Sequence, residues 1–462
     1  MDSIDKPREH WSSRLGFIMA AAGSAIGLGT LWMFPYITGE NGGGAFILTY
    51  ILCTLLIGIP LFIAELILGR AAQKSAVPTF TVLDRPQTPW RIGGWLGVAS
   101  SFLIMSYYSV LAGWGLNYAF MSLNQFWKGK SPQDIQQTFE LLQRSADITL
   151  FWHGLFTFIT IAVVYRGIKN GIEHWSKVMT SSLLVLLVLL VCYNTTLPGL
   201  QQATTFIFCP EWSKLKPSAI LEALGLSFFT LSLGQGIMIT YGSYMKRVED
   251  IPKTACIIAT MVIVVSQLAA LAIFPIVFTF GMSPQGGSGL VFKTLPLLFS
   301  QLPGAQILST LFFILFVFTA LTSAIALVEV VVATLMDLTS LSRKQLSIYV
   351  GCALFLFGIP SALSHTNLLF GNWPELYGKT FFETISSLVS IWLLPIGGLI
   401  VCLFTGWKVN QDLLKAEFCS ASQLKPLFRI WLHFVRWVCP VAIFIIILQQ
   451  SGLINIDVLF KQ

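Results

Sequence analysis

Small hydroxyl and amide side chains gather beside glycines in two otherwise apolar stretches of the chain. Residues 20–41 read AAAGSAIGLGTLWMFPYITGEN and include Ser24, and residues 225–242 read GLSFFTLSLGQGIMITYG and include Ser232 and Gln235. Glycine and proline interrupt helices, and a membrane helix interrupted at mid-depth needs protein, water or a ligand to satisfy its freed backbone groups. Freed N–H groups attract a carboxylate, and freed carbonyl oxygens attract a small cation. The two stretches therefore predict a site for a zwitterion and a small cation.

Hydroxyl groups elsewhere in the chain could complete such a site. Thr322 and Ser323 are adjacent in the apolar segment FTALTSAIAL, where they could bind a cation or could merely bond back to the preceding helical turn. Tyr107 and Tyr108 lie within a third apolar stretch. An aromatic side chain at such a position usually packs, but a buried phenol also needs a hydrogen-bond partner.

Three acidic residues fall inside apolar stretches, where a charge is costly and often functional: Glu65, Glu329 and Glu383. Glu65 could instead form a local ion pair with Arg70 at the end of its stretch. The chain has no Ser/His/Asp set, HExxH motif or P-loop that would indicate catalysis. We therefore predict that the protein is not an enzyme.

The composition indicates a polytopic membrane protein. Of the 462 residues, 55% are hydrophobic and 11% are charged, whereas soluble domains carry about 25% charged residues. Basic residues are scattered along short loops, which is a membrane topology signal and not a nucleic-acid-binding pattern. Their distribution predicts that the N-terminus is cytoplasmic. Eleven stretches are long enough to span a bilayer: 14–37, 42–69, 92–124, 148–165, 173–194, 218–245, 254–282, 305–337, 346–364, 381–407 and 430–453.

The two glycine-interrupted stretches are the first and the sixth of these spans. This position predicts an all-α fold with two five-helix repeats, about 14–194 and 218–407, in which helices 1 and 6 are discontinuous. An extra helix follows at about 430–453, and residues 1–462 form one transporter domain. The segment 283–304 is expected to fold over an outer vestibule.

Longer motifs make the chain similar to a known family. REHWSSRLGFIMAAAGSAIGLGTLWMFPY, ENGGGAF, IPLFIAELILGR, SYYS, FFTLSLGQG, ITYGSY and LTSAIAL occur in this order and resemble the neurotransmitter:sodium symporter family, in particular its bacterial amino-acid transporters. The resemblance covers essentially the whole chain. It implies the leucine-transporter fold, with an inverted repeat, and import of an amino acid with Na⁺ by alternating access.

The resemblance also implies roles for individual residues. The substrate would contact Ser24, Ala25, Leu28, Gly29, Tyr108, Phe229, Thr230, Ser232, Gln235, Ser323 and Leu327. A second sodium site would use Gly23, Ile26, Thr319, Thr322 and Ser323. Tyr108 would hold the substrate carboxylate and Phe229 would close the pocket from outside. An inner gate would consist of Arg8 and Asp337 with Ser243 and Tyr244.

The sequence departs from the family pattern at four sites. The first sodium site keeps Ala25 and Thr230, but Thr30 and Val262 replace two asparagines, so we expect one Na⁺, bound at the second site. Tyr50 and Ser266 match the chloride site but Leu226 replaces its glutamine, so we expect no chloride coupling. The outer gate has Met33 and Ser386 in place of an ion pair, and Glu383 lies one turn from Ser386. Gln235, where an aromatic residue is common, predicts a substrate with a polar side chain or a water molecule that fills the gap.

Two alternative functions remain open at this stage. A degraded first sodium site and Glu329 would also suit a proton-coupled or sodium-independent transporter of amino acids or amines. A non-transporting amino-acid sensor is the alternative from another class. For the transporter we expect an amino-acid substrate, the lipid bilayer of a bacterial inner membrane, no nucleic acid, and a monomer or homodimer.

Overall fold

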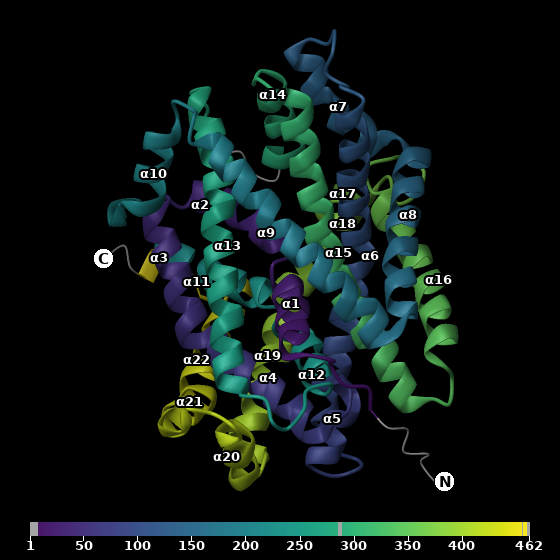
Figure 1. The fold of residues 1–462 in the computed structure, drawn as a ribbon, viewed down its shortest axis with the longest axis vertical. Helices are drawn as coiled ribbons and strands as arrows, with labels where there is room; N and C mark the ends of the chain where they lie inside the picture. Colours follow the sequence, from purple (N-terminus) through teal and green to yellow (C-terminus); the bar gives the residue numbers. More distant parts are fainter. Residues whose placement is uncertain (1–7, 285–288, 455, 460–462) are drawn as a thin grey trace.

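The computed structural model describes residues 8–284, 289–454 and 456–459, and this part of the chain is helical throughout (Figure 1). Nine of its helices are long and apolar enough to span a membrane: Gly44–Ala72, Arg91–Leu123, Ala146–Tyr165, Ile168–Asn194, Ile251–Thr279, Ala305–Leu338, Arg343–Ala362, Phe381–Lys408 and Lys425–Gln450. A tenth span is a bent helix pair near the N-terminus.

Several of these spans contain short π-helical turns and are therefore divided into smaller elements. The second span comprises α3 (Gly44–Cys53), η2 (Thr54–Gly58) and α4 (Ile59–Ala72). The long single helices are α6 (Arg91–Leu123), α8 (Ala146–Tyr165), α13 (Ile251–Thr279), α15 (Ala305–Leu338) and α16 (Arg343–Ala362), and η3 (Ile168–Glu173) precedes α9 (His174–Asn194). The span Phe381–Lys408 comprises α18 (Phe381–Ser387), η7 (Leu388–Leu393), α19 (Leu394–Leu403) and η8 (Phe404–Lys408). The last span, Lys425–Gln450, comprises η9 (Lys425–Leu427), α21 (Phe428–His433), η10 (Phe434–Val438) and α22 (Cys439–Gln450).

The bent pair is the first interrupted span predicted from the sequence. Helix α1 (Arg14–Ala25) ends at Ile26, which leaves helical geometry with φ −80° and ψ 62°. The chain then continues through η1 (Gly29–Met33) and α2 (Phe34–Glu40), at 49° to α1. Pro35 lies in the first turn of α2, where its missing N–H group is not needed.

The second interruption separates α11 (Pro217–Thr230) from α12 (Ile237–Gly242). Three residues between them have left-handed φ values: Ser232 at 55°, Gly234 at 73° and Gly236 at 72°. Such a run cannot continue an α-helix. This pair corresponds to the sixth stretch predicted from the sequence, 218–245, and neither helix alone reaches the length that a bilayer requires.

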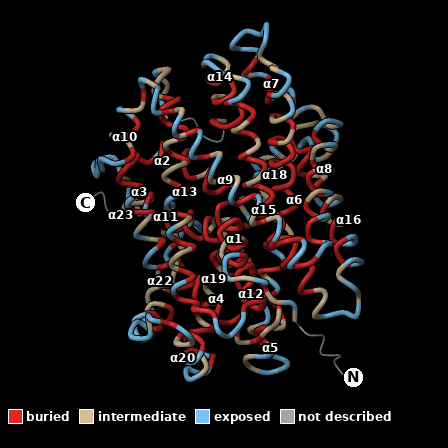
Figure 2. Tube along the Cα trace, viewed as in Figure 1, coloured by how far each residue is buried: buried red, intermediate tan, exposed pale blue. Residues whose placement is uncertain are grey.

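The two interruptions lie at the centre of the molecule. Helices α6 and α15 are 33 and 34 residues long and pack on each other beside α1. In Figure 2 the buried segments concentrate around α1, α4, α12 and α15, whereas α7, α10 and α20 at the periphery are largely exposed. The long helices therefore position the interrupted ones in the interior, where their backbone is shielded from lipid.

Shorter helices cover the two ends of the bundle. At the end away from the N-terminus lie α7 (Pro132–Arg144), α10 (Leu200–Phe208), α14 (Leu295–Ser300) and α17 (Trp373–Tyr377), and at the other end lie α5 (Ala76–Leu83) and α20 (Gln411–Cys419) (Figure 1). The turn η6 (Leu290–Thr294), which precedes α14, packs on α7 through stacked rings of Phe292 and Phe139, with centroids 5.0 Å apart. The segment 283–304, which was predicted to fold over the vestibule, includes η6 and α14. Its residues 285–288 lie outside the described chain.

Candidate functional site

The backbone of the first interruption meets the second at Ser24. Its carbonyl oxygen accepts hydrogen bonds from the hydroxyl of Ser232, at 3.2 Å, and from the hydroxyl of Ser323, at 2.8 Å. The Ser24 and Ser232 hydroxyl oxygens are also 3.3 Å apart. Three elements distant in the sequence thus contribute oxygen atoms to one buried point, as the sequence predicts for these residues.

Tyr108 lies on α6 opposite the first interruption. Its hydroxyl accepts a hydrogen bond from the backbone N–H of Leu28 at 3.3 Å, and the side chain is 3% exposed. A Cβ atom placed on Gly29 would come within 2.6 Å of the Phe229 ring, so Phe229 lies directly against this backbone. A phenol and an amide N–H at one position are donors that suit a carboxylate.

The predicted second sodium site is brought together in part. Thr322 donates a hydrogen bond to the carbonyl of Thr319 at 3.0 Å, and Gly23 packs so closely on Thr322 that an added Cβ would lie 3.2 Å from its Cβ. Ile26 ends α1, so its carbonyl is not used by a following helical turn. Ser323 joins the group through its bond to Ser24. Carbonyl and hydroxyl oxygens gather here, which are suitable ligands for a small hard cation.

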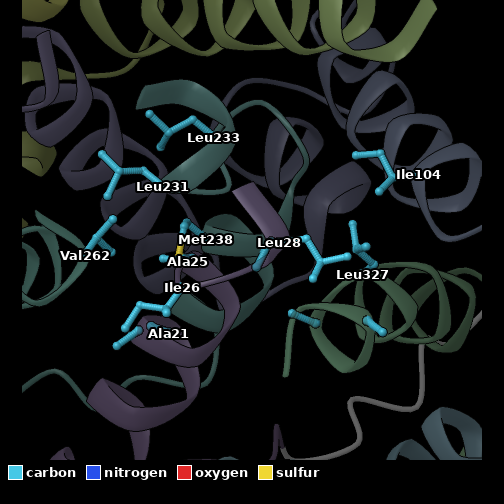
Figure 3. Close-up of a cluster of buried hydrophobic side chains, with 14 of the residues drawn as sticks. Ala21, Ala25, Ile26, Leu28, Ile104, Leu231, Leu233, Met238, Val262 and Leu327 are labelled. Atoms are coloured by element: carbon cyan, nitrogen blue, oxygen red, sulfur yellow. The ribbon is translucent and has the colours of Figure 1, made fainter. Parts of the chain in front are cut away.

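The predicted first sodium site has an apolar side. Thr30 donates to the carbonyl of Ala25 at 3.5 Å, and the hydroxyl of Thr230 lies 2.9 Å from that of Tyr50. Val262 is 0% exposed, and Figure 3 shows it among apolar side chains on the side of Ala25. A valine presents no oxygen to a cation.

An apolar wall flanks the Tyr108 side of the site. Figure 3 shows Leu28, Leu327 and Ile104 converging from the first interruption, α15 and α6. The backbone carbonyl of Gln235 accepts a hydrogen bond from the hydroxyl of Ser101 on α6 at 2.8 Å. Gln235 therefore lies beside α6, about one helical turn from Ile104. Its side chain is 4% exposed. A largely buried amide of this kind can donate and accept hydrogen bonds.

Glu65 supports the second interruption and does not pair with Arg70. One carboxylate oxygen of this fully buried residue accepts the backbone N–H of Gly234 at 2.7 Å, and the other has no partner in the described chain. Arg70 instead binds Glu417 at 2.6 Å. The predicted local ion pair is therefore wrong, because two residues five positions apart on a helix do not share a face.

The predicted inner gate is assembled as expected. Arg8 binds both carboxylate oxygens of Asp337 at 2.9 Å and the hydroxyl of Ser243 at 2.7 Å. The guanidinium carbon lies 4.6 Å from the centre of the Tyr244 ring. Ser75, which the sequence did not single out, also donates to Asp337 at 2.6 Å. These bonds join the segment before α1 to α12, α15 and the start of α5.

The two remaining intramembrane acids have local partners. Glu329 binds Arg343 at 2.6 Å and accepts a hydrogen bond from the Tyr244 hydroxyl, also at 2.6 Å. It therefore belongs to the same inner network as the gate. Glu383 accepts bonds from the N–H and hydroxyl of Thr380 as part of the N-terminal cap of α18. This contact gives Glu383 a structural role at a helix end.

The outer end contains a cavity of about 430 Å³ between α2, α11, α19 and α22. Met33 and Phe229 both line it. The side chain of Ser386 is a hydrogen-bond partner of the Tyr107 hydroxyl. The Tyr107 ring packs edge-on against the Phe382 ring, with centroids 5.5 Å apart. Met33 and Ser386 thus supply an apolar and an uncharged polar side chain where the family pattern has an ion pair, while Glu40 and Glu222 also line the outer cavity.

A latch at the start of α1 was missed by the sequence analysis. Glu173, which is 1% exposed, accepts a bond from the backbone N–H of Ser12 at 2.7 Å and further bonds from the hydroxyls of Ser12 and Ser13. Lys177 balances its charge at 2.7 Å. The available signal was an acid four residues before a lysine at the start of a span, but its partners lie some 160 residues away.

We predict that Glu173→Gln loosens the start of α1. An amide cannot accept as many bonds as a carboxylate, and hydrogen bonds to a charged group contribute about 1.5–3 kcal/mol. Hydrogen exchange of the backbone amides in residues 11–20 should therefore accelerate by about tenfold or more. Glu211→Gln, which alters an exposed acid, is the matched control. Equal exchange in the wild type and Glu173→Gln would contradict the latch.

Comparisons with known proteins agree with this geometry. The model of the sodium:neurotransmitter symporter family matches residues 8–145 and 126–456. The uncharacterized sodium-dependent transporter YhdH of Bacillus subtilis is 41% identical over 454 residues, covering 98% of this chain and 100% of YhdH. The sodium-dependent dopamine transporter of Caenorhabditis elegans is 27% identical over 82% of this chain and 71% of its own length.

A solved structure shares the fold. The crystal structure of MhsT in complex with L-phenylalanine superimposes with a TM-score of 0.87 and 41% sequence identity, covering 96% of this chain and 100% of MhsT. The sequence-based prediction of the leucine-transporter fold is thereby confirmed.

Proposed function

The chain belongs to the sodium:neurotransmitter symporter family, and from this we propose that it imports an amino acid together with Na⁺ by alternating access. It is a multi-pass, sodium-dependent transporter and not an enzyme. The observation that carries the proposal is the convergence of both interrupted helices with α15 on the carbonyl of Ser24. The L-phenylalanine bound to MhsT supports an amino acid as substrate.

The Tyr108 side of the site would bind the substrate carboxylate. The Tyr108 hydroxyl already contacts the Leu28 N–H, so a carboxylate here would receive a phenol O–H and backbone amides near Gly29. The oxygens of Ser24 and Ser232 and the carbonyls freed by the second interruption would receive the ammonium group. The carboxylate would then lie at the positive, N-terminal end of an interrupted helix, and the ammonium group would lie at the negative, C-terminal end.

One Na⁺ would be bound at the second site, by the carbonyls of Gly23, Ile26 and Thr319 and the hydroxyls of Thr322 and Ser323. Val262 argues against a second ion because it contributes no oxygen beside Ala25, Thr30 and Thr230. Chloride is not expected, because Leu226 provides no hydrogen-bond donor next to Tyr50. Sodium and substrate can shift the transporter between states only by binding one state more tightly than the other.

Alternating access would require the two ends to open in turn. The Arg8–Asp337 contact and the Glu173 latch hold the inner end of α1, and both must release for inward opening. Phe229 and Met33 line the outer cavity and would close over bound substrate. We place the protein in a bacterial inner membrane with a cytoplasmic N-terminus, in agreement with the distribution of basic residues.

The test is uptake into proteoliposomes. Labelled amino acids would be offered under an inward Na⁺ gradient, with K⁺ in its place, or under a pH gradient. We expect uptake only with the Na⁺ gradient. Uptake driven by pH alone would favour the proton-coupled alternative, with the unpaired oxygen of Glu65 as the first candidate carrier. Binding without exchange of labelled substrate across the vesicle wall would indicate a sensor.

Gln235 should select substrates with a polar side chain. Its largely buried amide can hydrogen-bond a hydroxyl or amide of the substrate, whereas an apolar side chain offers it no partner. Gln235→Met is expected to shift selectivity by about tenfold from polar towards apolar amino acids. Competition against labelled uptake by serine, glutamine, leucine and phenylalanine measures this shift.

The matched control for this prediction is Gln201→Met on the exposed surface of α10. It should leave the order of competitors unchanged. An unchanged order in Gln235→Met, or in Gln235→Phe, would show that Gln235 does not determine selectivity.

A further inference from the structure

An apolar groove opens on the membrane-spanning surface near the end of the bundle that carries the N-terminus. It has a volume of about 240 Å³ and lies between the second span and the last one. Leu56, Ile59 and Ile63 form one wall, and Leu427 and Ile430 belong to the opposite wall. The groove therefore lies between two helices that both face lipid.

A second hollow extends this groove towards the bundle end. It has a volume of about 450 Å³ and shares Cys256 and Leu424 with the apolar groove. Its lining adds the polar side chains of Lys253, Gln423 and Thr260. The apolar groove thus continues into a mouth that is itself largely apolar but carries these polar side chains, an arrangement that suits an amphiphile.

Three exposed cations belong to this region. Lys253 lines the mouth, and Lys425 and Arg429 are the sequence neighbours of the groove-lining residues Leu424 and Ile430. None of them takes part in the ion pairs of the described residues. They lie at the starts of the spans Ile251–Thr279 and Lys425–Gln450, which places them at headgroup depth.

The acidic residues near the mouth are already engaged. Asp250 caps α13 by accepting the N–H of Lys253, and its other carboxylate oxygen accepts the N–H of Gln423. Glu417 is held by Arg70. Hydrogen bonds from N–H groups leave the charge of Asp250 in place, and the Glu417–Arg70 pair is neutral. Lys253, Lys425 and Arg429 therefore outnumber the opposing acids Asp250 and Glu249.

We propose that this groove binds an anionic phospholipid of the leaflet on the N-terminal side. One acyl chain lies in the apolar groove, and the headgroup phosphate is held by Lys253, Lys425 and Arg429. Since lipid tails are as apolar as the groove walls, the preference for this lipid comes from the charged headgroup. With three cations near the headgroup, we expect the groove to bind the anionic lipid about tenfold or more tightly than a zwitterionic lipid with the same chains.

This lipid would be linked to the transport site through the second span. Ile59 and Ile63 line the groove, and Glu65, on the same helix, holds the N–H of Gly234. Gly58 lies against Leu231 in the second interruption, since an added Cβ would come within 2.6 Å of it. The proposal concerns a surface away from the substrate and does not depend on which amino acid is carried.

The test compares thermal unfolding of the purified transporter in detergent with added phosphatidylglycerol or phosphatidylcholine of identical chains. We expect phosphatidylglycerol to raise the midpoint by about 2–4 °C more than phosphatidylcholine. The triple variant Lys253→Gln/Lys425→Gln/Arg429→Gln should lose this difference. Leu56→Trp, which fills the groove and keeps the charges, should also lose it.

The matched control removes three cations at the same end but away from the groove: Arg166→Gln/Lys169→Gln/Lys344→Gln. All three of these residues are exposed. This control should retain the full difference between the two lipids. Equal stabilisation of the wild type by both lipids, or an equal loss in the control, would overturn the proposal and indicate a general effect of surface charge. Retention of the difference in Leu56→Trp would exclude the groove.

Discussion

Amino-acid uptake by the Gly234→Ala variant is expected to fall to background, with substrate binding weakened by about 30-fold or more. Gly234 has a φ of 73°, and an added Cβ would lie 2.4 Å from the carbonyl oxygen of Leu394. The left-handed conformation is unfavourable for alanine by about 1–2 kcal/mol, and overpacking adds about 1–3 kcal/mol. The strained backbone would also move the N–H that Glu65 holds. Binding is measured by the thermal shift that substrate produces, and uptake is measured in proteoliposomes.

The control for this variant is Gly225→Ala in helix α11. An added Cβ at Gly225 meets no atom within 4 Å, so alanine should be neutral or should stabilise the helix by up to about 1 kcal/mol. Size-exclusion chromatography and circular dichroism would establish that both variants fold. If folded Gly234→Ala bound substrate within about threefold of the wild type, the geometry of the second interruption would not form the site.

The positions of the two interruptions could be predicted from the sequence because they follow from local chemistry. Glycines in an apolar stretch predict where a membrane helix breaks, and the structure has both breaks at such glycines, whereas Pro35 lies within α2 after the first break. The hydroxyl residues around the breaks were candidates for the same reason. The resemblance to the family added Tyr108 as a carboxylate ligand, and in the structure its hydroxyl accepts the Leu28 N–H.

Pairings between distant elements could not be predicted in the same way. A local pair with Arg70 was one of two explanations for Glu65, but the fold pairs Arg70 with Glu417 and leaves Glu65 to the N–H of Gly234. Glu329 was considered as a proton carrier without its partner Arg343, which begins the next helix. Such partners depend on which helix faces are packed together, and periodicity in one sequence does not contain that information.

The direction of a hydroxyl group is likewise set by the fold. Thr322 could bind a cation or bond to its own helix, and in the structure it donates to the carbonyl of Thr319. These two roles are compatible, because a hydroxyl that donates its hydrogen keeps lone pairs for a cation. The contact with Gly23 places those lone pairs beside α1, and this packing turns an ordinary helical hydroxyl into a possible sodium ligand.

The double variant Thr322→Val/Ser323→Ala is accordingly expected to lose sodium-stimulated uptake. Two of the five proposed ligands disappear, while the volume at both positions is nearly kept. Interactions with a charged group contribute about 1.5–3 kcal/mol each, so half-saturation by Na⁺ should rise by about tenfold or more. Uptake measured against external Na⁺ at constant ionic strength gives this value, and K⁺ serves as the blank.

Thr334→Val is the matched control for the sodium prediction because it makes the same change on the same helix. The Thr334 hydroxyl is fully buried and has no partner within the described chain, so its removal should change neither folding nor the sodium response. A normal sodium response in the double variant would place the ion elsewhere, with Ala25, Thr30 and Thr230 as the remaining oxygen-bearing group. Loss of sodium dependence with uptake retained would instead show that Thr322 and Ser323 couple the ion to transport without forming the substrate site.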